Sequence, residues 1–198
     1  MTSAAMTVDE AERLQARVAA LEQERKHLLA VIEILQEIGG TLHFADIVQS
    51  VALRLGETFG LDRCSIFLAE RGGGRVRLVA SYEDPGIRNY AVDLERYPEL
   101  ARALRSGETV FIGDVASDPT LSLARGALAA RRVKTITVIP ISWRGSAIGA
   151  IFLRTFRDGP AFSAGDLQFC QVVANLTAKA LRNAHRFERL QEKWGQGG

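Results

Sequence analysis

A heptad pattern of apolar residues near the N-terminus is the feature that most limits how this sequence can fold. The positions of the pattern are alternately four and three residues apart, and one of them is occupied by Arg25. This spacing is typical of a helix whose apolar seam packs against a partner helix. Packing of the helix on its own domain is the alternative, but its first half has no obvious partner except a second copy of the chain. The seam consists of Leu14, Val18, Leu21, Arg25, Leu28, Ile32 and Leu35.

Both ends of the chain are predicted to be long helices. The N-terminal apolar stripe widens after residue 28 and ends at Gly39 and Gly40, which indicates that its last turns contact several surfaces. A second helix is expected to begin at Ser163, with Asp166 supporting its first turn. The predicted divisions are an N-terminal coiled-coil helix at 1–38, a core at 39–162, and a C-terminal helix with a tail at 163–198.

The middle of the chain carries short strand and helix patterns. Paired strands at both ends of this region, with helices between them, predict an α+β fold in which helices sandwich an antiparallel sheet. Pro140 falls within an expected strand and indicates an edge or a bulge there. Residues 83–98 are expected to be irregular. The expected helices are 45–59, 99–105 and 121–132, and the expected strands are 63–69, 75–82, 109–112, 135–142 and 147–156.

Composition argues against several classes of protein. The 198 residues include 25 Lys and Arg against 23 Asp and Glu, so the charge does not point to a nucleic-acid partner. A cytoplasmic location without membrane contact is expected, because no apolar run approaches the roughly 18 residues that span a bilayer and no signal peptide is recognisable. The two cysteines, Cys64 and Cys170, have no CxxC spacing and are expected to be buried thiols.

Four segments of the sequence resemble motifs of GAF domains. Residues 61–68 (LDRCSIFL) are similar to the first strand, and residues 107–115 (GETVFIGDV) to the middle strand and its loop. Residues 138–142 with 149–153 resemble the closing hairpin, and residues 162–167 the start of the final helix. The resemblance covers about residues 28–190. It implies a six-stranded antiparallel sheet with the terminal helices on one face, a small-molecule pocket on the other, and a dimeric sensory role in signalling.

The sequence lacks the residues that several known GAF chemistries require. Cyclic-nucleotide-binding members carry an Asn-Lys pair and then Phe-x-x-x-Asp-Glu; Phe162 and Asp166 match, but Leu167 replaces the Glu. Residues 121–132 contain neither the Cys nor the His of bilin-binding members. Haem ligation and methionine sulfoxide reduction are disfavoured because the histidines lie in or beside the terminal helices and only two cysteines are present. A non-enzymatic domain without a cofactor is therefore expected.

The expected pocket lies among the middle loops and the sheet. Its floor is either Ser65 and Phe67 or Cys64 and Ile66, because a shift of one residue exchanges the two faces of a strand. Solvation or pairing within the sheet is the simpler role for each polar residue, but an anionic ligand is favoured if Arg131 and Arg88 face the pocket. Asp114 and Thr137 lead the predicted ligand-binding set, which is Asp114, Thr137, Thr135, Tyr90, Asn89, Arg131, Phe67 and Ser65.

Two functions from different classes fit this sequence. The first is a non-catalytic sensory module that binds a small molecule and shifts paired terminal helices. The second is a structural dimerisation module without a ligand, which serves a signalling partner or an output domain. A polar cavity would favour the first, and bulky side chains filling the pocket would favour the second. The predicted homodimer interface, for which a parallel arrangement is favoured, consists of Leu14, Val18, Leu21, Leu28, Ile32, Leu35, Leu176 and Leu190.

A third hypothesis concerns Arg25 and a basic cluster near the C-terminus, which consists of Arg182, His185, Arg186 and Arg189. Such a cluster can bind an effector or an anionic surface. The interspersed Glu188 and Glu192 favour an ordinary solvated helix face instead.

Overall fold

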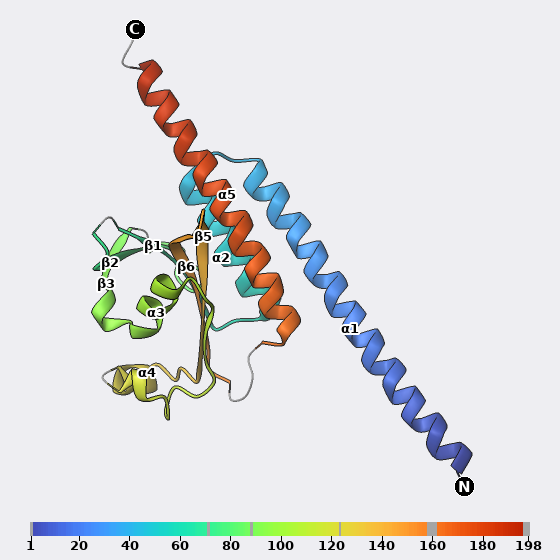
Figure 1. The fold of residues 1–198 in the computed structure, drawn as a ribbon. Coiled ribbons are helices and arrows are strands. Elements are labelled where there is room, and N and C mark those ends of the chain that lie inside the picture. Colours follow the sequence, from blue (N-terminus) through green and yellow to red (C-terminus); the bar gives the residue numbers. More distant parts are fainter. Residues whose placement is uncertain (1, 71, 88, 123, 158–161, 196–198) are drawn as a thin grey trace.

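The chain folds around one open antiparallel sheet with helices on both faces (Figure 1). The structure, a computed structural model, describes residues 2–70, 72–87, 89–122, 124–157 and 162–195, and within these ranges it describes side chains from residue 9 to residue 189. The α-helices are α1 (Thr2–Gly39), α2 (Phe44–Phe59), α3 (Pro98–Ser106), α4 (Arg125–Ala130) and α5 (Ala164–Gly195). The strands are β1 (Arg63–Ala69), β2 (Arg75–Ser81), β3 (Tyr90–Asp93), β4 (Val110–Ile112), β5 (Thr135–Trp143) and β6 (Ser146–Thr155).

The sheet has the order β3-β2-β1-β6-β5-β4, and each neighbouring pair is antiparallel. This arrangement confirms the predicted α+β fold with six strands and long terminal helices. Pro140 of β5 pairs with Ala150 of β6 on one side, whereas β4 reaches only as far as Val138 on the other. Beyond the end of β4, this part of β5 is therefore an edge of the sheet, which agrees with the prediction for Pro140.

Two of the predicted elements need correction. Residues 83–98 were expected to be irregular, but they contain β3 and a 3-10 turn at Leu94–Arg96. Because β3 has only four residues and pairs only with β2, its own sequence carries too short an alternation to reveal a strand. The helix expected at 121–132 is shorter, since α4 covers Arg125–Ala130 and Arg132 has a positive φ of 60°.

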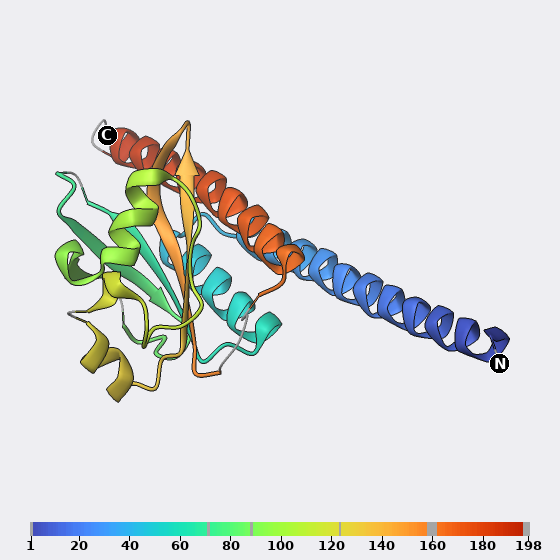
Figure 2. The ribbon, with the colours of Figure 1, turned by 60° about the horizontal axis from the view of Figure 1, so that its bottom comes forward.

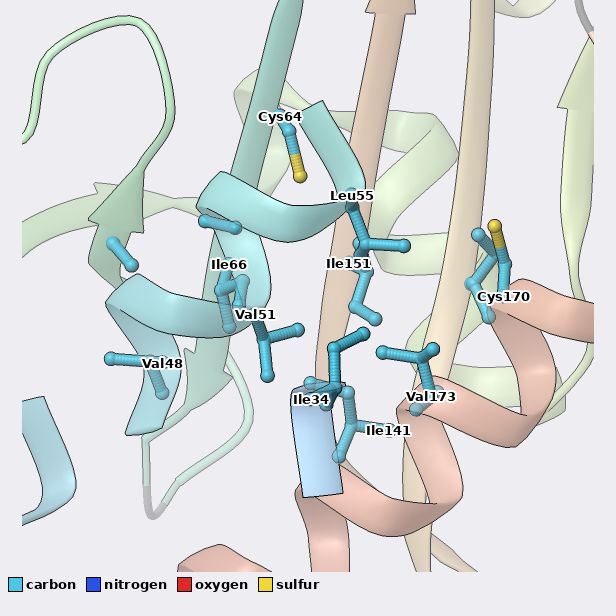
Figure 3. Packing of buried hydrophobic residues seen from close by; sticks show 14 of the residues in the cluster. Ile34, Val48, Val51, Leu55, Cys64, Ile66, Ile141, Ile151, Cys170 and Val173 are labelled. Carbon is cyan, nitrogen blue, oxygen red and sulfur yellow. The ribbon is translucent and has the colours of Figure 1, made fainter. Parts of the chain in front are cut away.

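Helices α1, α2 and α5 cover one face of the sheet, and α3 and α4 lie on the opposite side (Figures 1 and 2). The first core fills the space between the sheet and the terminal helices, where α2 and α5 lie directly on the strands. It includes the fully buried side chains of Ile34, Val51 and Ile151 (Figure 3). Cys64 and Cys170 belong to this core as free, buried thiols, as predicted, and burial raises the pKa of each.

Helix α1 has two apolar faces, which explains why its stripe widens. Its inner face packs on the first core through Ala30, Ile34 and Ile38. Its outer face exposes the predicted seam, and its N-terminal half extends away from the rest of the chain (Figures 1 and 2). A helix with two apolar faces buries only one of them within a single chain.

Candidate functional site

The pleat of β1 divides its side chains between the helices and a cavity on the other face. Cys64 and Ile66 pack in the first core, whereas Ser65 and Phe67 face the opposite side. The sequence left both assignments open, and the pairing of β1 with β6 settles the choice. Ser65 lies opposite Phe152, and both side chains line the same cavity.

This cavity has a volume of about 860 Å³ and lies over β1, β2 and β6. Ser65, Phe67, Phe152 and Arg154 line it from the central strands, and the segment after β2 contributes further lining residues. Its size falls within the range of ordinary small-molecule sites. The other lining residues are Arg63, Arg75, Leu78, Ser81, Glu83, Ile87, Tyr90, Ala91, Val92, Asp93, Arg96, Tyr97 and Arg131.

Arg154 is the most unusual residue of the cavity because it is a charged side chain in the central part of the sheet. Its residue surface is only 7% exposed, and its guanidinium carbon lies 5.1 Å from the centre of the Phe152 ring. Nη2 donates to Ser65 Oγ at 3.4 Å and to Glu83 Oε1 at 3.3 Å. Nε is buried and has no hydrogen-bond partner among the described residues. Burial lowers the pKa of Arg154, although Glu83 partly opposes this effect.

Glu83 is the acid that lies closest to this buried charge. It follows directly after β2, and its Oε1 lies 3.7 Å from Arg63 Nη1 as well as 3.3 Å from Arg154 Nη2. One carboxylate oxygen therefore faces two guanidinium groups. Such an arrangement partly compensates two neighbouring positive charges at the edge of the cavity.

A second acid, Glu99, is buried in the first turn of α3. It is 3% exposed, and its Oε2 has no hydrogen-bond partner among the described residues. Burial raises the pKa of Glu99, while its own backbone amide and the positive charge of Arg154 act in the opposite direction. Glu99 does not line the cavity.

Four of the predicted ligand-binding residues line this cavity, namely Ser65, Phe67, Tyr90 and Arg131. Arg88 lies outside the described residues, so its predicted place at the pocket stays a prediction. The other four, Asn89, Asp114, Thr135 and Thr137, do not line the cavity.

Thr135 and Thr137 alternate along β5 with Ile136 and Val138, which pack in a buried cluster on the α3 side of the sheet, so the two threonines point toward the terminal helices. Thr135 Oγ1 lies 2.8 Å from Thr155 Oγ1, and Thr137 is fully buried.

Asp114 is in an exposed loop, where its carboxylate accepts a hydrogen bond from the Ala116 amide at 2.9 Å. Hydrogen bonds from Ser117 and Ala116 lower the pKa of Asp114. Asn89 has a positive φ of 57°, and its backbone carbonyl accepts a hydrogen bond from Arg77.

The sequence reasoning missed Arg154, Arg63 and Glu83. The signal for Arg154 was present, since it is the one charged residue in an otherwise apolar stretch at 147–156. A charge within a buried strand needs a partner or a function. Glu83 had no comparable signal, because its position depends on how the chain turns after β2.

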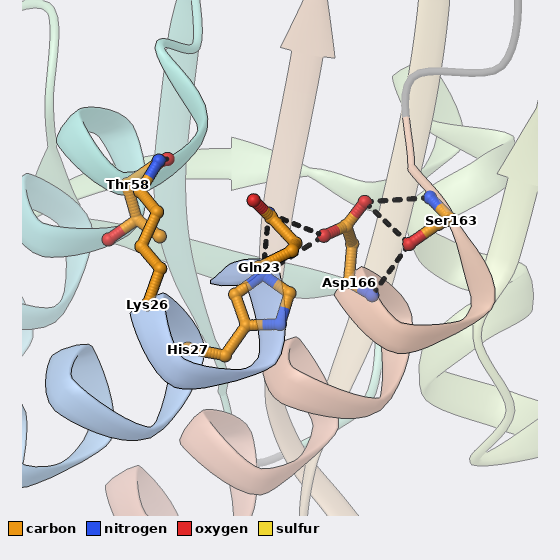
Figure 4. Close-up of polar contacts among 6 residues, drawn as sticks. All are labelled: Gln23, Lys26, His27, Thr58, Ser163 and Asp166. Carbon is orange, nitrogen blue, oxygen red and sulfur yellow. Dashed lines mark hydrogen bonds and ion pairs between the residues drawn. The ribbon is translucent and has the colours of Figure 1, made fainter. Parts of the chain in front are cut away.

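The terminal helices are joined by a polar contact within their apolar interface (Figure 4). His27 Nε2 on α1 lies 3.0 Å from Asp166 Oδ1, and Gln23 Nε2 donates to the same oxygen at 3.3 Å. Asp166 also accepts from the amide and hydroxyl of Ser163 at 2.8 Å, which is the predicted cap of α5. The His27 ring stacks on Phe169, with their centres 4.8 Å apart.

The predicted seam residues on α1 are exposed in the single chain. Leu14, Val18, Leu21, Leu28, Ile32 and Leu35 are between 43% and 60% exposed. Leu176 instead packs partly buried against the first core, and the side chain of Leu190 lies outside the described residues. A hollow of about 500 Å³ between α1 and α5 is lined by Leu28, Val31 and Val172, so the apolar surface continues from one helix to the other.

The basic cluster of α5 meets the hairpin between β5 and β6. Arg182, His185, Arg186 and Arg189 line a hollow of about 480 Å³ with Trp143 and Arg144. The guanidinium carbon of Arg182 lies 5.6 Å from the centre of the Trp143 ring. This contact holds one cation of the cluster against the end of the sheet.

Fold and cavity together define an α+β domain with terminal helices on one face of a central sheet and a cavity on the other. The sequence model of the GAF domain matches residues 43–181. The chain therefore belongs to the GAF domain family, whose members are small-molecule sensing and signalling modules and are generally regulatory rather than catalytic. No curated protein sequence matches the chain. Across the described residues, no helix is both long and apolar enough to span a membrane.

Solved structures resemble this fold at low sequence identity. The GAF domain from a phosphoenolpyruvate-protein phosphotransferase of Coxiella burnetii has a TM-score of 0.70 and 18% identity, covering 84% of this chain and 98% of that one. Free methionine-R-sulfoxide reductase from Neisseria meningitidis has a TM-score of 0.68 and 16% identity, covering 81% and 90%. The phycoerythrobilin-bound GAF domain of a cyanobacterial phytochrome has a TM-score of 0.67 and 19% identity, covering 82% and 97%. These similarities establish the fold alone.

Proposed function

We propose that this chain is a non-catalytic sensory module that binds a small molecule in the cavity and passes the signal through paired terminal helices. The observation that carries the proposal is the cavity of about 860 Å³, which combines apolar walls with charged and polar side chains. A pocket filled by bulky side chains would have favoured a purely structural role. Small-molecule sites typically combine an apolar lining with a few convergent polar groups.

Homodimerisation through α1 is part of the proposal. It is supported by the heptad spacing of the exposed side chains, because six apolar residues that are at least 43% exposed on one helix face are costly to leave in water. The apolar surface continues into the hollow between α1 and α5, so a second copy would contact both helices. Arg25 at an a position is suited to fixing the register of the pair.

The sheet offers a direct physical route from the cavity to the helices. Ser65 and Phe67 of β1 line the cavity, while Cys64 and Ile66 of the same strand pack in the core below the helices. A ligand that shifts β1 must therefore repack the core on its other face, because packed interiors transmit strain. Gln49 of α2 also donates to the carbonyl of Ser81 at 3.0 Å, at the end of the strand that leads to Glu83.

A thermal-melt screen of the purified protein against nucleotides, amino acids and organic acids tests the sensory proposal. A ligand at a hundred times its Kd adds about 2.7 kcal/mol, which corresponds to a rise in Tm of roughly 5–11 °C for a chain of this size. A saturable rise that disappears on substitution of Phe152→Trp, which fills the cavity, supports a sensor. Stability that no compound changes, together with a stable dimer, supports the structural dimerisation module instead.

A further inference from the structure

We propose that the cavity takes a small organic anion, a carboxylate or phosphate ester with an apolar body, whose charged end binds Arg154 in exchange for Glu83. The inference rests on the proposed function, since it names the ligand class of the same cavity.

The charge of the cavity lining is strongly unbalanced. The described lining residues include five arginines but only two acidic residues. Two of these arginines, Arg63 and Arg154, share the single carboxylate of Glu83. Such a concave, positively charged surface attracts anions and repels cations. The five arginines are Arg63, Arg75, Arg96, Arg131 and Arg154, and the two acids are Glu83 and Asp93.

Arg63 and Arg154 are direct cross-strand partners on β1 and β6. Their side chains leave the same face of the sheet, and like charges that lie directly opposite each other destabilise a strand pair. Arg63 also contributes to lowering the pKa of Arg154, after burial as the main cause. An anion placed between the two guanidinium groups would relieve this repulsion.

Arg154 retains hydrogen-bonding capacity that the protein does not use. Its side chain is 9% exposed, and the buried Nε has no partner among the described residues. A guanidinium group presents a planar fork of donors that matches the two oxygens of a carboxylate or the oxygens of a phosphate. Leaving a buried donor without a hydrogen bond costs free energy. A hydrogen bond from Nε to a ligand oxygen would remove this cost, so it would contribute more to binding than a hydrogen bond formed in water.

Glu83 binds Nη2 of the same guanidinium group, so a ligand that also binds Nη2 must displace its carboxylate. It is held by contacts of 3.3 and 3.7 Å to the two arginines, and it belongs to the segment after β2 rather than to a strand. Ile87, which lines the cavity, follows on the same connection, and Tyr90, which also lines it, is the first residue of β3. An incoming anion that displaces Glu83 would therefore also move this segment, and binding would change the chain at the mouth of the cavity.

The walls next to Arg154 are suited to an apolar ligand body. The rings of Phe67, Tyr97 and Phe152 lie with their centres 5.8–6.3 Å apart, and all three line the cavity. Leu78 and Ile87 add aliphatic surface on the side of β2. A ligand with one anionic end and an aromatic or aliphatic body satisfies both parts of the cavity.

The test compares four ring compounds that differ in charge. Benzoate and phenyl phosphate are the anions, benzamide is the neutral control, and benzamidine is the cation. Kd values are measured by calorimetry at concentrations up to about ten millimolar, where fragments of this size bind. The Arg154 Nε–H signal is followed by NMR, which reports on this side chain directly. We expect both anions to bind at least about tenfold more tightly than benzamide, and the stronger of the two distinguishes a carboxylate from a phosphate ligand.

Four variants complete the test. Arg154→Met and Arg63→Met should each remove most of the anion preference, and the second covers the case in which the first does not fold. Glu83→Gln should tighten anion binding several-fold, because it removes the internal competitor while keeping the shape of the side chain. Arg105→Met, at an exposed position in the last turn of α3, is the matched control and should change nothing.

Tighter binding of benzamidine than benzoate, or weaker anion binding by Glu83→Gln, would overturn the inference and leave the cavity as a site for another ligand class. Anions that bind without moving the Arg154 signal would overturn it as well. If none of the four compounds binds either the wild type or Glu83→Gln, the inference is overturned. The proposed function is contradicted only if the nucleotides, amino acids and organic acids of the thermal-melt screen also leave Tm unchanged.

Discussion

His27 Nε2 lies 3.0 Å from Asp166 Oδ1, and this contact joins the middle of α1 to the first turn of α5. Asp166 serves two purposes, since the same carboxylate also caps α5 through Ser163. The two terminal helices therefore share one acid. A change in this side chain should affect both the start of α5 and its packing against α1.

Asp166→Asn should lower stability by about 1 kcal/mol at neutral pH, which is typical for weakening a helix cap. Burial acts to raise the pKa of Asp166, but hydrogen bonds from Ser163 and Gln23 and the nearby His27 outweigh it, and the pKa lies below its ordinary value. The stabilisation is therefore present above about pH 4 and is lost as pH falls through the lower folded value. Urea unfolding at pH 2.5–7 should show less acid sensitivity in the variant. Equal acid sensitivity in both proteins would contradict this role.

Glu99→Gln should show the opposite pH dependence. Burial raises the pKa of Glu99, so the protonated form is favoured in the folded chain. The contribution of protonated Glu99 to stability is fully present below about pH 4, and it is lost as pH rises through the raised pKa of the folded chain. The variant should equal or exceed wild type by up to about 1 kcal/mol at pH 8, and the difference should shrink toward pH 4. A variant that is less stable at pH 8 would show that the ionised carboxylate has a partner in solution.

The exposed seam predicts a dimer that charge can disrupt. Val18→Glu with Leu21→Glu should weaken association by more than about a hundredfold, because it places unpaired charges inside the helix pair. Arg25→Leu should strengthen association, since it replaces a polar a residue by an apolar one. Sedimentation velocity over a concentration series measures both effects.

Leu53→Glu is the control for the seam variants. Leu53 is 41% exposed on α2, a helix that is not part of the seam, so this substitution should leave the mass unchanged. A dimer that survives the double substitution, or one that Leu53→Glu disrupts, would place the contact on another surface.

Two glycine substitutions should change stability in opposite directions. A Cβ on Gly149 would collide with the carbonyl oxygen of Phe67 on the neighbouring strand, so Gly149→Ala should destabilise the fold by about 1–3 kcal/mol. Gly126 lies within α4 with open space around it, so Gly126→Ala should stabilise by about 0.5–1 kcal/mol. Thermal unfolding measures both changes, and equal effects of the two would contradict the close approach of β6 to β1.

The sequence alone determined the elements with strong periodic patterns. The heptad at Leu14–Leu35 predicted a helix with an outward seam, and Ser163 with Asp166 predicted where α5 begins. The predicted strands became β1, β2, β4, β5 and β6 within one or two residues. These features depend on near neighbours in the chain, because the local period of apolar residues sets which side chains share a face.

Only the tertiary structure decided which side chains meet in the cavity. From the sequence, Thr137 was a leading prediction for the cavity and Ser65 only one of two alternative floor residues, but strand pairing turns Thr137 toward the helices and Ser65 toward the cavity. The contact between Glu83 and Arg154 joins residues 71 positions apart, and no local pattern reports such a pair. Residues 90–93 likewise form the strand β3 because they pair with β2, and no local pattern in the sequence predicts that pairing. Local periodicity fixes the faces of each element, whereas register and long-range packing decide what those faces surround.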